Sequence, residues 1–575
     1  MASNRTCGSG RPNDDVPINR TFGRERLNDD VSMRRDLATL GSAHFDVLVV
    51  GGGIVGACVA RDAALRGFTT ALIERNDFCS ATSAASSKMI HGGVRYLAQL
   101  QFGVVRESLR ERRIWLKIAP HLVRPLSFAI PFHGLTERIS RGIALQLFDL
   151  LAYDRGMLED PDLRLPRHGW WSAAEARERI PLLDAKGLSG AICYADCQAF
   201  APERLCLECI LDAARHGACV ANYVGAEQLA HDGARVTGVR ARDVATDTPI
   251  DIKARCVVNA TGPWAGELLR GESGDSSARH MTRSKGVHVI VRSLSDHHAV
   301  TLLGKRDHAF VIPWRGHSLL GTTDTPFRGD PDDVRPDESD IALLLGVVNR
   351  GMPDAHLTMN DVRYAYAGVR PLLGDPTGNS YTMSRRAEIV DHVVRGGPAG
   401  LVSALGGKWT TARHVAEQCT DTVARQLKAG DRSCTTHERP LPGGDVGTMR
   451  AFRADALREA SGRVPSETVE HLIGLYGALY RDVLERGTEQ PEVLLPVGEG
   501  APDIRAQVVR AVIDEQAHHA ADVLLRRTGI GTLGKPTDAV ITGVLEMMAR
   551  ELGWSAQEIA RQRAQVNALY PNDWR

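Results

Sequence analysis

The sequence of 575 residues predicts an α/β fold with a second, antiparallel sheet and a C-terminal region made only of helices. Near the N-terminus, HFDVLVV and TTALIER have the pattern of two strands that flank a helix-like segment. Farther along, GVHVIV and AFVIPW alternate as half-buried strands do, and from Met449 onward only helical periodicity remains. Because a usual domain has about 100 to 200 residues, we expect more than one domain.

The composition narrows the class of protein. Lys plus Arg number 70 and Asp plus Glu number 70, so the formal net charge is zero and no overall positive field favours nucleic acid as a partner. With 43% hydrophobic residues and 56 glycines, the chain is expected to fold. Its eleven cysteines are scattered through a long sequence, which favours reduced thiols in the cytoplasm over a disulfide framework.

No segment has the pattern of a secretory signal or a membrane span. Residues 1–44 lack a long apolar core and mix Arg with Asp and Asn, so we expect them to form a mobile tail. The longest stretch without a charged residue, Val47–Ala60, contains four glycines and is shorter than the roughly 20 apolar residues that a transmembrane helix needs.

The first strand, His44–Val50, runs directly into a glycine-rich turn, Gly51-x-Gly53-x-x-Gly56. The first glycine permits the tight turn, the second lets the backbone approach a pyrophosphate, and the third lets the next helix lie close to the strand. Glu74 ends the following strand, where a carboxylate can bind ribose hydroxyls. Together these features predict a dinucleotide-binding unit of the Rossmann type, and the alternatives are a structural turn and a solvated strand end.

Two further junctions indicate which dinucleotide is bound. The apolar strand Ala254–Asn259 leads to Gly262, and the strand Leu401–Leu405 leads to Gly406 and Gly407. Three strand-to-glycine junctions separated by long insertions suggest one cofactor wrapped by several returns of the chain. A flavin held in an extended pose needs contacts at both its ends, so FAD is favoured over a nicotinamide, in a domain like that of glutathione reductase.

Longer motifs support this interpretation. The sequence resembles FAD-dependent glycerol-3-phosphate dehydrogenase over about residues 45 to 575, in the run ATSAASSKMIHGGVRYL and then in VNATGPW, KGVHVIV, IPW, GTTD, GVRPL and GGKWTTAR. The resemblance implies an aerobic, quinone-linked flavoenzyme that forms a homodimer and binds peripherally to the inner face of the cell membrane. Such an enzyme oxidises sn-glycerol 3-phosphate to dihydroxyacetone phosphate and passes electrons to membrane quinone.

That substrate carries a phosphate dianion and a secondary alcohol, so it needs a cationic clamp. Arginine suits the clamp because its planar fork binds phosphate oxygens in pairs. Taken alone, each arginine would be assigned to a surface position or an ion pair. The resemblance implies Arg95, Arg370 and Arg385 as substrate-binding residues. We add Tyr96, which stands beside Arg95, and Thr323 and Asp324, which end an apolar strand where side chains can turn into a pocket.

A proton acceptor is also required. His288 and His91 are the candidates, because the usual pKa of histidine lies near the working pH, although a lone histidine is more often structural. Lys408 follows a glycine pair and could bind the developing alkoxide or the flavin edge, and its alternative is a surface lysine. The residues expected to act in catalysis are His288, Lys408, Arg370 and Arg95.

The expected cofactor contacts come from the glycine junctions and from the serine-rich run, whose hydroxyls could instead cap a helix. They are Gly51, Gly53, Gly56, Glu74, Ser83, Ser86, Ser87, Lys88, His91, Gly92, Gly262, Gly406, Gly407 and Lys408.

Two other clusters resemble metal sites only superficially. Cys193, Cys197, Cys206 and Cys209 have a poor zinc spacing, and the latter two fall on a helix-like pattern as small core residues. Glu515, His518, His519 and Asp522 lie on one predicted helix, which we expect to pack between domains or face solvent. No metal is therefore expected.

A candidate membrane contact lies between the first two of the three segments predicted for the cofactor domain. Ile139, Ile143, Leu147, Leu150 and Leu151 form an apolar stripe at helical spacing behind Arg138 and Arg141. Basic amphipathic helices can lie in a bilayer interface, although such stripes are more often part of a core. The need to reach a lipid-dissolved quinone favours the membrane interpretation.

These patterns divide the chain into a tail, two interleaved domains and a helical cap. The expected parts are a tail at 1–44, an FAD-binding domain at 45–125, 188–265 and 365–430, a substrate-binding domain at 126–187 and 266–364, and a helical domain at 431–575.

Three rival functions remain open at this point. A glycerol-3-phosphate oxidase of the same fold would reduce oxygen to peroxide. An amine-oxidising relative would share the glycine pattern but have little use for several arginines. A flavin-bound redox sensor without turnover would need the flavin but no clamp for a phosphoalcohol, so Arg95, His288, Arg370 and Lys408 argue against it.

Overall fold

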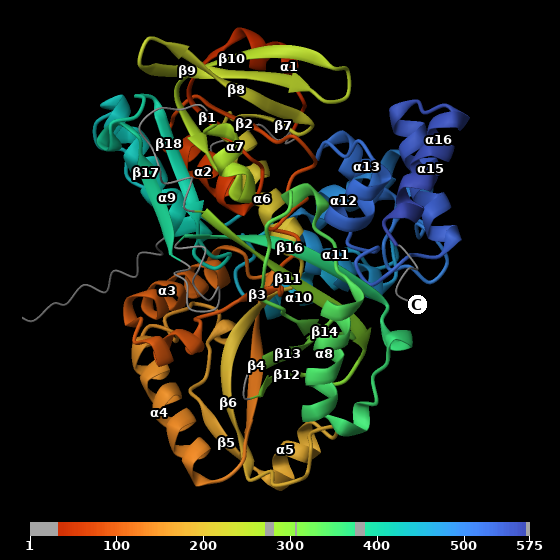
Figure 1. Cartoon of the computed structure of the whole chain (residues 1–575). Coiled ribbons are helices and arrows are strands. Elements are labelled where there is room, and N and C mark those ends of the chain that lie inside the picture. The colour runs from red at the N-terminus through yellow and green to blue at the C-terminus, as the bar shows by residue number, and fades with distance from the viewer. Residues whose placement is uncertain (1–32, 271–280, 305–307, 374–385, 571–575) are drawn as a thin grey trace, which may run out of the picture.

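A computed structural model describes residues 33–270, 281–304, 308–373 and 386–570. The chain forms two sheets, one above the other in Figure 1, with the C-terminal helices along one side. Among the described residues no helix is long and apolar enough to cross a membrane. The α/β class, the second sheet and the C-terminal helices agree with the sequence prediction.

The first sheet has a parallel core. β1 lies between β10 and β2 and is parallel to both, β18 and β7 extend this parallel set, and β17 and β9 run antiparallel at its sides. Its strands are β1 (His44–Val50), β2 (Thr70–Ile73), β7 (Cys219–Ala221), β8 (Val224–Asp232), β9 (Arg235–Asp243), β10 (Thr248–Asn259), β17 (Ala387–Asp391) and β18 (Leu401–Gly406).

Both faces of β1 are covered, by α2 (Ile54–Leu65), α6 (Pro202–Arg215) and α9 (Ala412–Leu427) on one side and by α1 (Leu37–Ser42), β8 and β9 on the other. Val47, Leu48, Val49 and Val50 are all buried, as expected for a central strand of a parallel sheet. The helix α2 follows the glycine turn and contacts α6 and α9. Shorter helices α1 and α7 (Ala265–Leu268) lie near this sheet (Figure 1).

The second sheet is antiparallel except for the pair β4 and β12. One face packs on α5 (Ala173–Arg179) and α8 (Glu338–Gly351), and α3 (Phe102–Ile118) and α4 (Leu135–Leu151) lie at the other side (Figure 1). Its strands are β3 (Met89–Ile90), β4 (Val123–Phe132), β5 (Gly169–Ser172), β6 (Gly190–Ala199), β11 (Met281–Arg292), β12 (His298–Leu303), β13 (His308–Trp314), β14 (His317–Gly321), β15 (Thr325–Pro326) and β16 (Tyr364–Leu373).

Three strands, β3, β6 and β16, lie in the second sheet although the sequence division assigned their residues to the cofactor domain. β3 falls within residues 45–125, β6 falls within residues 188–265 and β16 begins residues 365–430. In the structure β6 pairs along its whole length with β4, and β16 pairs with β11. The cause is tertiary, because alternation along a strand identifies its buried face and not its partner.

The C-terminal region of the described chain is helical. Its helices are α10 (Met449–Glu459), α11 (Ser466–Tyr476), α12 (Tyr480–Glu489), α13 (Arg505–Ile513), α14 (Ala520–Asp522), α15 (Asp538–Leu552) and α16 (Ala556–Ala568), with a π-helical turn at Val523–Arg527.

The prediction of one helix through Glu515, His518, His519 and Asp522 is wrong. α13 ends at Ile513, and Gln516 has a φ of 52°, so the histidines do not lie one turn from Asp522 on a continuous helix. The break carries Glu515 inward, where it receives hydrogen bonds from Arg204 at 2.8 Å and 2.7 Å. A buried carboxylate with such partners outweighs the local helical pattern.

A buried ion cluster joins this region to the first sheet. Asp77, just beyond β2, accepts hydrogen bonds from Arg527 at 2.8 Å and 2.9 Å, from Asn222 at 2.9 Å and from Arg526. The two guanidinium groups hold the pKa of Asp77 well below its usual range, against the opposing effect of burial. The C-terminal helices thus hold the loop that follows β2.

The four cysteines that were considered as a zinc site lie on two different elements. Cys206 and Cys209 are buried on α6, whereas Cys193 and Cys197 lie on β6. Within the described ranges, no group of three or more His, Cys, Asp or Glu side chains is arranged to hold a metal ion.

Candidate active site

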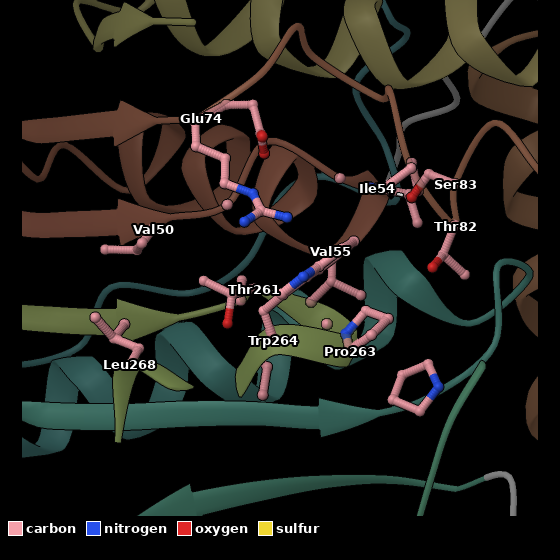
Figure 2. A pocket seen from close by; sticks show the side chains of 18 of the residues that line it. Val50, Ile54, Val55, Glu74, Thr82, Ser83, Thr261, Pro263, Trp264 and Leu268 are labelled. Carbon is pink, nitrogen blue, oxygen red and sulfur yellow. Dashed lines mark hydrogen bonds between the residues drawn. The ribbon is translucent and has the colours of Figure 1, made fainter. Parts of the chain in front are cut away.

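A cavity of about 440 Å³ lies where β1, β10 and β18 end. All three strand-to-glycine junctions that the sequence singled out contribute to its wall. Figure 2 shows Glu74 on one side of this space, Ser83 and Thr82 at another, and Thr261, Pro263 and Trp264 opposite Glu74. Parallel strands that end together, each followed by a glycine turn, form the usual crevice for a dinucleotide.

The first junction requires glycine for steric reasons. Gly51 has a φ of +110°, and a Cβ there would lie 2.6 Å from the carbonyl oxygen of Ala260. A Cβ on Gly56 would overlap the carbonyl oxygen of Gly51, so α2 can approach the strand only without a side chain. At the other junctions, Gly262, Gly406 and Gly407 also have positive φ values of 60°, 69° and 101°. The backbone therefore forms a close-fitting wall around the cavity.

The N-terminus of α2 opens into this cavity. The Ile54 N–H donates a hydrogen bond to the Ser83 hydroxyl at 3.0 Å, as Figure 2 shows, and the Trp409 indole donates to the Ser83 carbonyl at 3.1 Å. A helix N-terminus favours anions, so this end of the cavity suits a pyrophosphate. Ser83, a predicted cofactor contact, lines this cavity.

Glu74 lies at the far end of the cavity from Ser83 (Figure 2). Its carboxylate accepts hydrogen bonds from the backbone N–H groups of Gly52 at 2.7 Å and of Asn76 at 2.9 Å. Burial raises the pKa of Glu74, and the two N–H groups oppose that rise. Each carboxylate oxygen has a further lone pair, so these contacts are compatible with binding ribose hydroxyls.

A second group of site residues gathers on β11, β14 and β16. Arg370 donates hydrogen bonds to the Thr323 carbonyl at 3.1 Å and to the Thr322 hydroxyl at 2.6 Å, and its Nη1 lies 3.7 Å from Asp324 Oδ1. Thr323 is buried, and its hydroxyl accepts from the Val287 N–H at 2.9 Å. The next residue after Arg370, Pro371, lines the cofactor cavity.

Gly286 makes room for this arginine. A Cβ on Gly286 would lie 2.5 Å from Arg370 Nη1 and closer still to its other guanidinium atoms. Gly286 pairs with Gly368 across β11 and β16. The guanidinium therefore lies across a part of the sheet that carries no side chain.

His288 lies beside Arg370 and is almost fully buried. Its Nε2 is 2.7 Å from the Ser87 hydroxyl, and its ring stacks on Tyr366 at a centroid distance of 5.1 Å. Burial lowers the pKa of His288 well below its usual value, and the charges of Arg370 and Lys88 lower it further. The imidazole is therefore neutral at physiological pH, the form that can accept a proton.

A third group surrounds Lys408, which lines the cofactor cavity. The ammonium donates a hydrogen bond to the Ser108 hydroxyl at 2.9 Å and lies 4.4 Å from the centre of the Tyr96 ring. The Arg95 guanidinium is 5.0 Å from the same ring and donates to the Tyr96 hydroxyl at 3.1 Å. The structure thus brings Arg95, Tyr96 and Lys408 together.

Several predicted cofactor contacts have other partners. Lys88 is buried, ion-paired with Glu203, and donates to the Ala84 carbonyl at 2.8 Å, so it faces a second cavity instead of the cofactor cavity. The sequence analysis did not predict that the Ser87 hydroxyl would lie 2.7 Å from His288 Nε2. The Ser86 hydroxyl accepts from the Lys88 N–H at 3.3 Å.

Two contacts in the IHGG segment use the backbone. The His91 N–H donates to the Thr410 hydroxyl at 3.1 Å, and the Gly92 N–H donates to the Asp196 carboxylate at 3.0 Å and 3.1 Å. A Cβ on Gly92 would lie 2.6 Å from the Phe148 ring. The hydrogen bonds hold the segment against β6 and the turn before α9, and the absence of a side chain on Gly92 leaves room for Phe148 of α4. Arg385, a predicted substrate contact, lies outside the described residues.

Aromatic residues at the site were not predicted individually. Trp264 lies under the Arg75 guanidinium at 4.5 Å, and Trp409 holds the Ser83 carbonyl. Both occur in motifs that the sequence analysis noted, VNATGPW and GGKWTTAR, so their position next to the glycine junctions was the available signal. For Tyr366, which stacks on His288, the sequence offered no such signal, because the residues around Tyr366 alternate as they do in any ordinary strand.

Comparisons with known proteins agree with this geometry. Residues 46–413 match the family of FAD dependent oxidoreductases, and residues 434–559 match the C-terminal domain of alpha-glycerophosphate oxidase. Glycerol-3-phosphate dehydrogenase of Synechocystis is 34% identical over 92% of this chain and 96% of that protein. Glycerol-3-phosphate dehydrogenase 2 of Mycobacterium tuberculosis is 36% identical over 92% of this chain and 88% of that protein.

A solved structure matches over nearly the whole chain. The X-ray structure of glycerol-3-phosphate dehydrogenase from Bacillus halodurans, complexed with FAD, aligns with a TM-score of 0.74 and 28% identity over 94% of this chain and 97% of that chain. Glycine oxidase from Geobacillus kaustophilus, 22% identical with a TM-score of 0.51, shares the fold. The chain belongs to the FAD-dependent oxidoreductase family, and relatives that match it over most of its length are named glycerol-3-phosphate dehydrogenase.

Proposed function

We propose that the protein oxidises sn-glycerol 3-phosphate to dihydroxyacetone phosphate with bound FAD and passes the electrons to a membrane quinone. The observation that carries the proposal is that Arg370 on β16 lies near His288 on the neighbouring strand β11 and donates to the Thr323 carbonyl. Arg370 also directly precedes the cavity-lining Pro371. A guanidinium and a neutral imidazole together suit a substrate with an anionic phosphate and an ionisable hydroxyl. An amine substrate would not require this pairing.

The cofactor cavity fits FAD in its steric and polar features. Gly51 and Gly56 leave no space for side chains where the backbone must approach a pyrophosphate, and the N-terminus of α2 faces the same place. Glu74 is placed to bind the ribose, and Lys408 with Gly406 and Gly407 would hold the pyrimidine edge of the isoalloxazine. Bound flavin would supply the hydride acceptor for the carbinol carbon.

The side chains of the chain itself bind and orient the alcohol. Arg370 and Arg95 would hold the phosphate through paired N–H groups, and Lys408 would stabilise negative charge that develops on the hydroxyl oxygen. His288 would take the hydroxyl proton, since its low pKa keeps an imidazole nitrogen free of a proton. Removal of that proton makes the carbinol carbon a better hydride donor.

The quinone and the membrane belong to the same proposal. On α4 the predicted stripe is exposed at Ile139 (53%), Ile143 (66%) and Leu150 (63%), with Leu135 exposed on the same helix. Leu147 and Leu151 instead pack against the core beside α4. An exposed apolar helix face with Arg138 beside it suits the surface of an anionic bilayer, where a quinone is dissolved. We infer a peripheral location on the cytoplasmic face of the cell membrane, as a homodimer.

Visible spectra of the purified protein test the proposal. Anaerobic glycerol 3-phosphate should bleach the flavin, a soluble quinone analogue should restore the colour rapidly, and air should restore it slowly. Rapid recovery in air alone would instead favour an oxidase. A yellow protein that glycerol 3-phosphate does not bleach would contradict the proposed substrate and favour a sensor.

A further inference from the structure

The imidazole of His288 is fixed in place with one nitrogen directed at Ser87. Tyr366 stacks on one side of the ring, with an interplanar angle of 20°, and its hydroxyl is held by the Ser86 carbonyl at 2.7 Å. Across the strand pair, a Cβ on Gly321 would lie 2.9 Å from His288 Nε2 and closer still to Cδ2. The ring therefore packs against backbone and an aromatic face, which leaves it little room to rotate.

Ser87, in contrast, is accessible. Only 1% of His288 is exposed, whereas Ser87 is partly exposed and its hydroxyl lies 2.7 Å from His288 Nε2. The other ring nitrogen, Nδ1, has no hydrogen-bond partner among the described residues. In the described structure, a proton can therefore reach His288 only by way of the Ser87 hydroxyl or after a rearrangement of the ring.

We propose that Ser87 is a proton relay: it receives the proton of the substrate hydroxyl and passes its own to His288. The inference rests on the proposed function, because it assigns the route of the proton in that oxidation. It also gives Ser87 a role different from the cofactor contact that the sequence suggested.

Each bond that breaks in this proton transfer is matched by a bond that forms. The O–H bond of the substrate breaks and its proton binds Ser87 Oγ, while the Ser87 O–H proton binds Nε2 of His288. The carbinol C–H bond breaks as a hydride, whose two electrons bound flavin would accept, and the carbon–oxygen single bond becomes a carbonyl. One proton remains on His288 and later leaves through the same hydroxyl.

The charges around His288 are compatible with this transfer. Lys88 and Arg370 lie near the ring and disfavour a permanent positive charge, but each has its own carboxylate, Glu203 for Lys88 and Asp324 for Arg370. The imidazole thus stays neutral before the reaction, and its protonated form returns the proton readily. Tyr366, the remaining titratable neighbour, has a pKa raised well above its usual value by burial and stays protonated.

The chain contains a matched control. In the first sheet, the Ser403 hydroxyl lies 2.8 Å from Nε2 of His392, and both residues are fully buried. Ser403→Ala removes the same type of hydrogen bond away from His288. Comparing it with Ser87→Ala separates loss of a serine–histidine bond from loss of the relay.

The experiment measures anaerobic flavin reduction by glycerol 3-phosphate in stopped flow. We expect Ser87→Ala to lower the limiting rate by about 10²- to 10⁴-fold, the usual contribution of acid–base catalysis, with little change in the substrate concentration at half-saturation. Ser87→Thr, which keeps a hydroxyl, should restore most of the rate, and Ser403→Ala should leave it unchanged. His288→Asn combined with Ser87→Ala should be no slower than either single variant, because both act on one proton.

A second readout does not depend on turnover. In the holoenzyme labelled with ¹⁵N-histidine, with the His288→Asn variant used for assignment, His288 should show an unprotonated Nε2 between about pH 6 and 8. A protonated Nε2 in that range would overturn the relay, since that nitrogen could not accept a proton. So would wild-type bleaching kinetics in Ser87→Ala, or single-variant effects that multiply in the double variant. Failure of glycerol 3-phosphate to bleach the wild-type protein would instead overturn the proposed function, and the relay with it.

Discussion

Substitution of Gly286 by alanine should displace the Arg370 guanidinium. The new Cβ would lie 2.5 Å from Arg370 Nη1 and closer to Cζ and Nη2, far inside ordinary contact distance. Gly286 lies in β11 and its φ is not in the left-handed region, so alanine can adopt its backbone conformation. The arginine must move, and it then loses its hydrogen bonds to the Thr323 carbonyl and the Thr322 hydroxyl.

The expected magnitude follows from the bonds that a displaced Arg370 can no longer offer to a phosphate. A hydrogen bond involving a charged group contributes about 1.5–3 kcal/mol, so losing one such bond should raise the apparent substrate constant roughly 10- to 150-fold. Steady-state kinetics with glycerol 3-phosphate and a soluble quinone analogue measure this constant. Arg370→Ala should have at least as large an effect, and the double variant should add little to it.

Two measurements test whether the substitution has simply unfolded the protein or released its flavin. The flavin content and Tm of Gly286→Ala should remain close to those of the wild type, and Gly156→Ala, where a Cβ would meet no atom within 4 Å, serves as the control substitution. An unchanged apparent substrate constant in a well-folded Gly286→Ala protein would refute the clamp role of Arg370.

Three further outcomes are expected. Glu74→Gln should weaken FAD binding about tenfold, measured by the fluorescence of released flavin, because a carboxamide cannot accept from both backbone N–H groups as well as from a ribose; unchanged retention would contradict the ribose contact. His414 and Arg413 lower the pKa of Glu417 to about 2, so its stabilising effect should be complete above about pH 4.5 and disappear as the pH falls towards 2. In Glu417→Gln the acid dependence of Tm over that interval should flatten, and an unaltered slope would argue against the pairing. Ile139→Glu with Ile143→Glu should abolish sedimentation with anionic vesicles while leaving anaerobic bleaching intact; continued sedimentation would place the membrane contact elsewhere.

The sequence predicted best those features whose cause is local. The turn at Gly51 and the helix behind it follow from the short distance between backbone segments, and the distance from the turn to Glu74 follows from the strand–helix–strand unit. Helical periodicity likewise predicted the helices of the C-terminal region. In these cases the sequence pattern is confined to one stretch of the chain, even where, as at Gly51, the close contact is with a distant residue, Ala260.

Features with distant causes were missed. The membership of β6 and β16 in the second sheet depends on partners far away in the chain, and so does the contact between Ser87 and His288, which are 201 residues apart. Helical periodicity failed at Glu515 because an ion pair with Arg204, 311 residues away, pulls the carboxylate into the interior. Several polar side chains could form such long-range contacts, and only the folded structure shows which of them do.

The ion cluster at Asp77 affects when the cofactor cavity can be completed while the chain is being synthesised. Asp77 belongs to the loop next to Glu74 and Asn76, which line the cofactor cavity, yet its partner Arg527 lies 450 residues later. While a ribosome is still translating the chain, this carboxylate lacks the guanidinium groups that compensate its burial, so the loop is not yet held in place. Tight capture of the flavin should therefore be a late event, which follows release of nearly the complete polypeptide.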